Sequence, residues 1–143
     1  MKLTDEIRKN PVYPFLLMLV LTTAMGFQAW RTLLNNFAVE VSGIDGFEMG
    51  AIQSLREVPG LLVFLVVFIM LLIKEHRLAS LSVILMGAGI ALTGFFPTFW
   101  GLMITTVIMS IGFHYYETCF KSLTLQHFKL TESPVVFARL RSY

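Results

Sequence analysis

Three long apolar runs restrict what this chain can fold into. Residues 12–30 carry no charged side chain, residues 58–73 carry no polar side chain, and residues 78–116 contain no Asp, Glu, Lys or Arg. A helix needs about 20 mostly apolar residues to cross the hydrocarbon core of a bilayer. Backbone polar groups in lipid must be satisfied within each segment, and these runs lack the two-residue alternation of barrel strands. The predicted fold class is therefore all-α, a polytopic membrane protein.

Proline divides the longest run into two. Pro97 lies among aromatic residues, and proline stops a helix while aromatic rings favour the membrane interface. We therefore expect four transmembrane helices, at about residues 12–38, 49–73, 78–96 and 98–127 of a membrane region spanning 12–128. Residues 1–11 are expected to form a cytoplasmic head and residues 129–143 a cytoplasmic loop or tail. A cleaved signal peptide is the competing interpretation of the first run, although no small-residue cleavage site follows it.

Composition and charge agree with a membrane protein. Hydrophobic residues make up 56% of the chain and charged residues 14%, against about 45–50% and about 25% in soluble domains. The net charge of +2 is not gathered in a soluble domain, so we expect no nucleic-acid partner. Cys119 is the single cysteine and cannot form a disulfide within the chain.

The basic residues predict the orientation. Between the first two expected spans lie three acidic residues (Glu40, Asp45 and Glu48) and no Lys or Arg. Because cytoplasmic loops are enriched in Lys and Arg, both termini are expected on the cytoplasmic side of a plasma or inner cell membrane. Most of the 11 basic residues precede the first span, separate the second from the third, or end or follow the fourth: Lys2, Arg8, Lys9, Lys74, Arg77, Lys121, Lys129, Arg139 and Arg141.

Polar residues form a stripe on each of two expected spans. On the first span they follow i, i+3, i+4, i+7 spacing, and the fourth span repeats that spacing. Polar groups at membrane depth usually face a partner or a water-filled cavity, so the two stripes predict a shared solute path. For the fourth span, whose stripe lies in the inner half of the membrane, the alternative is a polar seam at the inner interface. The stripes are Gln28, Arg31, Thr32 and Asn35, and His114, Glu117, Thr118 and Lys121; the expected solute-path residues are Gln28, Arg31, Asn35, His114, Glu117 and Thr118.

The expected membrane depth of two charged residues predicts one ion pair. With a rise of 1.5 Å per residue, Arg31 and Glu57 each lie about 25 Å from the inner face. On adjacent antiparallel helices they would meet, which gives the hypothesis of an Arg31–Glu57 pair. The alternative is that Arg31 and Arg56 extend to the outer headgroups. Small residues on the third span (Gly87, Ala91 and Gly94) predict a close helix contact.

Other chemistry has little support in the sequence. His114 and Glu117 have metal-ligand spacing, but no third ligand is evident on that face, so no metal site is expected. Glycine-rich phosphate loops and nucleophile or zinc-enzyme motifs are missing. We therefore expect neither an enzyme nor a cofactor. The expected partners are the lipid bilayer and a small-molecule solute, with a proton or another ion as a candidate coupling ion because histidine and carboxylate side chains can carry protons.

The chain resembles the opening third of a major facilitator superfamily transporter over about residues 15–128. The resemblance rests on residues 31–37 (RTLLNNF), 50–60 (GAIQSLREVPG), 74–77 (KEHR) and 110–114 (SIGFH). The family's glycine and aspartate are missing before the 74–77 loop, and Ile108 stands where its fourth helix often has arginine. The resemblance implies a secondary transporter of small solutes that works by alternating access, with its first and fourth helices lining the central cavity.

The resemblance also implies a fragment, because that family needs twelve helices in two halves. The remaining transporter helices would then be partners. Two alternatives stay open. One is a complete four-helix transporter that works as a homodimer. Such a protein would need a buried acidic residue early in the first span, and residues 12–30 contain none. The other is a non-transporting membrane subunit or assembly factor whose polar stripes bind partner helices.

Overall fold

A computed structural model describes residues 7–142 of the chain. The first part of the expected cytoplasmic head, including Lys2, lies outside the described residues. Every element of the described part is a helix, so the all-α fold class is confirmed. The helices are α2 (Val12–Glu40), α3 (Gly46–Leu61), α4 (Leu65–Leu72), α5 (Glu75–Thr93), α6 (Phe99–His127) and α7 (Ser133–Leu140).

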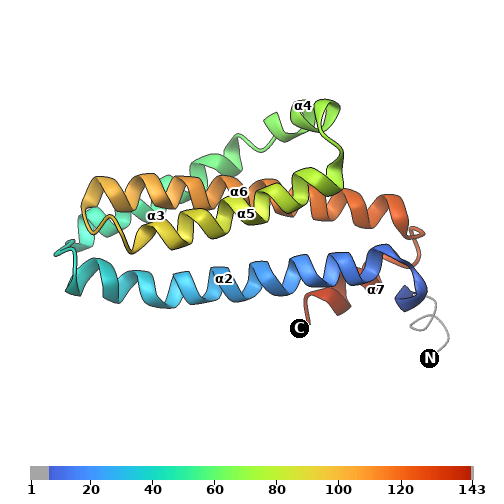
Figure 1. The fold of residues 1–143 in the computed structure, drawn as a ribbon, viewed down its shortest axis with the longest axis horizontal. Helices are drawn as coiled ribbons and strands as arrows, with labels where there is room; N and C mark the ends of the chain where they lie inside the picture. Colours follow the sequence, from blue (N-terminus) through green and yellow to red (C-terminus); the bar gives the residue numbers. More distant parts are fainter. Residues whose placement is uncertain (1–6, 143) are drawn as a thin grey trace.

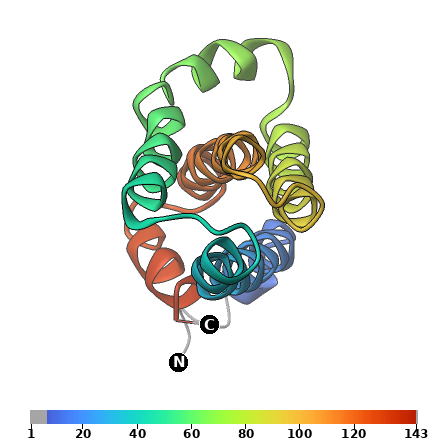
Figure 2. The ribbon, with the colours of Figure 1, turned by 90° about the vertical axis from the view of Figure 1, so that its left-hand side faces the viewer.

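Helix α6 lies at the centre of the helix bundle. It packs closely against α5 on one side and α3 on the other, while α2 packs on α5 and α6 (Figures 1 and 2). The short helix α4 projects away from the long helices, and α7 folds back beside α2 and α6 (Figure 1). Helices that follow one another in the chain are therefore not always neighbours, since α3 packs mainly on α6 rather than on α2.

Acidic residues of the first loop organise the start of α3. The backbone N–H of Glu48 donates to Asp45 Oδ1 at 2.8 Å, and the N–H of Asp45 donates to Glu48 Oε2 at 3.1 Å. This reciprocal pair satisfies N–H groups that have no partner within the helix. Just before it, Gly43 adopts φ +65°, a left-handed conformation that glycine tolerates without strain. The turn between α2 and α3 thus follows from its local sequence.

The expected second span is not one continuous helix. Helices α3 and α4 meet at a bend of 54°. Pro59 lies inside α3, removing a backbone donor and crowding the preceding turn, and flexible Gly60 follows it. Beyond these residues the chain tightens, and Val63 donates to Gly60 at 3.3 Å in an i to i−3 hydrogen bond. The single helix predicted over residues 49–73 is therefore corrected to a broken pair.

Glycine does bring α5 and α6 close together, but through residues other than those expected. A Cβ atom on Gly89 would lie 2.5 Å from the backbone N of Met109, and one on Gly112 would lie 2.5 Å from the carbonyl oxygen of Ser82. A Cβ on Gly87 would meet no atom within 4 Å. The predicted seam of Gly87, Ala91 and Gly94 is therefore wrong, and the contact uses Gly89 and Gly112 on the facing sides of the two helices.

The helices have the length and composition of a membrane protein. Both α2 and α5 are long and apolar enough to cross a bilayer, and α3 with α4 makes a third candidate if the bent pair is one span. Large apolar side chains remain exposed on several helices, for example Met25 at 73% and Leu72 at 88%. Such surfaces suit hydrocarbon rather than water.

Candidate functional site

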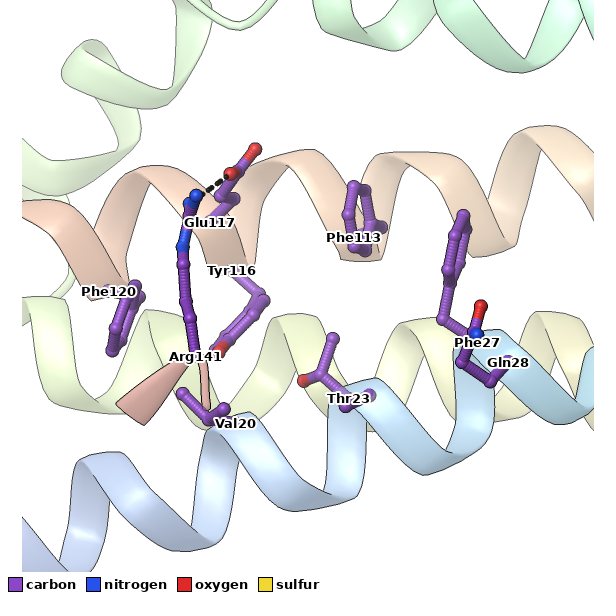
Figure 3. Close-up of a pocket in the computed structure, with 10 residues that line it drawn as sticks. Val20, Thr23, Phe27, Gln28, Phe113, Tyr116, Glu117, Phe120 and Arg141 are labelled. Carbon is purple, nitrogen blue, oxygen red and sulfur yellow. Dashed lines mark hydrogen bonds and ion pairs between the residues drawn. The ribbon is translucent and has the colours of Figure 1, made fainter. Parts of the chain in front are cut away.

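A groove of about 410 Å³ lies between α2, α6 and the end of α7. Its size falls within the range of small-molecule pockets, about 300–1,000 Å³. Figure 3 shows its walls, with side chains from α2 and α6 pointing toward each other. Its aromatic, polar and charged lining residues include Thr23, Phe27 and Gln28 from α2, Phe113, Tyr116 and Glu117 from α6, and Arg141.

Aromatic rings join the two main walls of the groove. Phe27 on α2 and Phe113 on α6 stack with ring centroids 4.7 Å apart and an angle of 18° between their planes. Phe27 also stacks on Trp30, which is buried in the core, at 6.0 Å. Aromatic pairs of this kind contribute about 0.5–1.5 kcal/mol beyond their buried area. The stack therefore provides a flat apolar wall and helps to hold α2 beside α6.

Charge gathers at the α7 end of the groove. The carboxylate of Glu117 lies 3.1 Å from Arg141 Nη2 and 3.3 Å from Lys121 Nζ. The Glu117 side chain is only 31% exposed, whereas both cations are more than half exposed. One carboxylate is thus shared by two positive groups, of which Arg141 lines the groove and Lys121 does not.

Two buried hydroxyl residues also line the groove. Thr23 on α2 and Tyr116 on α6 are 4% and 5% exposed, and both line the groove. The Tyr116 ring reaches across toward α2 beside Thr23 (Figure 3). Hydroxyls can both donate and accept hydrogen bonds, so these two add polar groups to the otherwise aromatic contact between α2 and α6.

The structure brings together two of the six expected solute-path residues. Gln28 and Glu117 line the same groove from α2 and α6. Arg31 and Asn35 are exposed on α2 beyond Gln28 and are not part of its lining. Thr118 is half-buried, and its hydroxyl donates a hydrogen bond to the backbone oxygen of His114 at 3.0 Å. The two stripes therefore share one groove only in part.

His114 faces α3 rather than the groove. Its ring packs against Gly60, where an added Cβ would lie 2.8 Å from His114 Cε1. It borders a small hollow of about 40 Å³ together with Arg56 and Glu57. Nearby, the Ser110 hydroxyl donates a short hydrogen bond to the backbone oxygen of Arg56. His114 thus belongs to the contact between α3 and α6.

The expected Arg31–Glu57 ion pair is not formed. Glu57 pairs with its neighbour Arg56, whose Nη2 atom lies 2.6 Å from the carboxylate. The guanidinium of Arg56 also lies over the Phe27 ring, 6.0 Å from its centroid. The prediction treated α2 and α3 as adjacent helices, but α3 packs mainly against α6. Glu57 therefore meets a cation of its own helix.

Sequence reasoning missed three contributors to this region: Arg141, Arg56 and the Phe27–Phe113 stack. Arg141 follows α7, and Pro134 near the start of that helix was a local signal for it. The aromatic stack and the Arg56 contact depend on the packing of separate helices, which no local pattern reveals. Within residues 7–142, no three His, Cys, Asp or Glu side chains come together as metal ligands would.

No known protein family, curated protein or solved structure matches this chain.

Proposed function

We propose that this chain is the first part of a secondary transporter of small solutes, similar to the major facilitator superfamily, and that the groove between α2 and α6 belongs to its solute path. The observation that carries the proposal is the position of Gln28 and Glu117, which line one groove from two long helices. Ionisable and strongly polar side chains at membrane depth are costly and usually mark a substrate or ion path.

The arrangement of the helix ends supports a transporter with both termini on the cytoplasmic side. The side-chain amide of Asn10 donates to the backbone oxygen of His127 at 2.8 Å, which places the start of α2 beside the end of α6. Gln126 donates to Glu75 at 2.7 Å, which places the start of α5 at that same end (Figure 1). The basic segments before α2, before α5 and after α6 are thus at one end of the assembly, as the positive-inside rule requires.

In this proposal the chain crosses the membrane four times. Helices α2 and α5 are the first and third spans, the bent pair α3 and α4 is the second, and α6 is the fourth. A bent second span is acceptable in a bilayer where neighbouring helices cover the break. Exposed apolar side chains on α4, such as Leu71 at 79%, would contact lipid or the remaining helices of the transporter.

Cysteine accessibility tests the proposal directly. In a Cys119→Ser background, Gln28→Cys and Glu117→Cys are each treated with a charged thiosulfonate reagent in native membranes. Both are expected to react, because the groove would be open to water. Ala29→Cys is the matched control: Ala29 is exposed at nearly the same depth but about 100° around α2, where lipid would cover it. If Gln28→Cys and Glu117→Cys resist the reagent as Ala29→Cys does, the groove is not a solute path.

A further inference from the structure

We propose that the groove selects small aromatic anions, namely carboxylates attached to a flat ring system. This inference rests on the proposed function and names the substrate class of the same groove. Two of its features point to that chemistry: an aromatic wall on α2 and α6, and a guanidinium at the α7 end.

The aromatic wall suits a flat ring. Phe27 and Phe113 form a stacked pair at 4.7 Å, and Phe120 also lines the groove. A ligand ring can extend such a stack in an offset or edge-to-face arrangement. A groove of about 410 Å³ has room for a molecule of one or two fused rings.

The guanidinium of Arg141 suits a carboxylate. Its contact with Glu117 uses one nitrogen, Nη2, at 3.1 Å. A guanidinium carries five N–H groups in a planar fork that matches a carboxylate, so donors remain for a ligand. Lys121 lies outside the lining, 3.3 Å from the same Glu117 carboxylate, and offsets part of its negative charge, which favours a second anion beside Arg141.

An organic cation fits the groove poorly. Among the described residues that line it, Glu117 is the one carboxylate, and it is already shared by Arg141 and Lys121. The face of Phe27, which could attract a cation, already has the guanidinium of Arg56 at 6.0 Å. A positively charged ligand would therefore meet like charge without an unpaired anionic partner.

Three naphthalene derivatives of similar shape test this assignment: 1-naphthoate, 1-naphthylmethanol and 1-naphthylmethylamine. Their binding is measured by calorimetry on the 143-residue chain in phosphatidylcholine nanodiscs, with empty nanodiscs subtracted. We expect the acid to bind about tenfold more tightly than the alcohol, as one charge-assisted hydrogen-bonded contact would provide. The amine should bind more weakly than the alcohol.

Variants of the ion pair give opposite expected effects. Arg141→Gln should reduce the affinity for 1-naphthoate about tenfold, to that of the alcohol. Glu117→Gln should increase it, because Arg141 loses its competing carboxylate. Lys74→Gln removes the same charge from an exposed position outside the groove and should leave binding unchanged. Circular dichroism of each variant verifies that the helices are retained, and Arg141→Lys should fall between wild type and Arg141→Gln.

The outcomes separate this inference from the proposed function. If all three compounds bind equally, or if Arg141→Gln does not change the affinity for 1-naphthoate, the substrate class is wrong. The groove would still be a solute site. Failure of all three to bind above empty nanodiscs would contradict both the substrate class and the groove as a solute site.

Discussion

The guanidinium of Arg141 lies 3.1 Å from the carboxylate of Glu117, although 24 residues separate them in the chain. The contact joins the end of α7 to the middle of α6 and completes one end of the groove. Apolar packing supports it from the other side of α7, where Val136 and Leu140 are fully buried. Helix α7 is therefore held by two kinds of interaction of very different strength.

Truncating Leu140 should release α7 far more than removing the Arg141 charge. Leu140→Ala removes a fully buried side chain and should weaken the docking of α7 by about 2–5 kcal/mol. Arg141→Gln removes an ion pair whose arginine side chain is 60% exposed, which is worth less than about 1 kcal/mol. Hydrogen exchange of the α7 amides measures both effects. A larger effect of Arg141→Gln would mean that electrostatics, rather than packing, holds this helix.

Two glycines on α5 should respond in opposite ways to the same substitution. Gly89→Ala places a methyl group against the backbone of Met109 and should cost about 1–3 kcal/mol of stability. Gly87→Ala meets open space and should be neutral or stabilising by up to about 1 kcal/mol, because alanine favours a helix. Thermal unfolding in detergent, followed by circular dichroism, compares the two. Similar melting temperatures would show that α5 and α6 do not meet at Gly89.

Exchanging the charges of Arg31 and Glu57 should not restore the stability that the single substitutions remove. Glu57 pairs with Arg56, and Arg31 makes no ion pair within the described residues. The double variant Arg31→Glu, Glu57→Arg should therefore be no more stable than the less stable of the two single variants. The same unfolding assay measures all three proteins. Recovery of wild-type stability in the double variant would support the Arg31–Glu57 pair and would mean that α2 packs against α3.

Local sequence was enough to predict the long helices and their apolar character, but not the separate short helices α4 and α7. Apolar runs, a dividing Pro97 and polar spacing of three and four residues are properties of neighbouring residues, and helix formation depends on neighbouring residues. They predicted an all-helical membrane chain and selected Gln28 and Glu117, which the structure places on one groove. The break at Pro59 and Gly60 in the second span also has a local cause, because proline and glycine both weaken a helix.

Only the tertiary structure decided which helix faces which. Hydrophobic periodicity shows that a helix has an inner face, but it does not identify the partner of that face. Here α3 packs on α6, so Glu57 stays with Arg56, and Gly89 and Gly112 replace the expected small-residue seam. Those choices depend on the fit of side chains far apart in the chain, where differences of one methyl group or one charge decide between alternative packings.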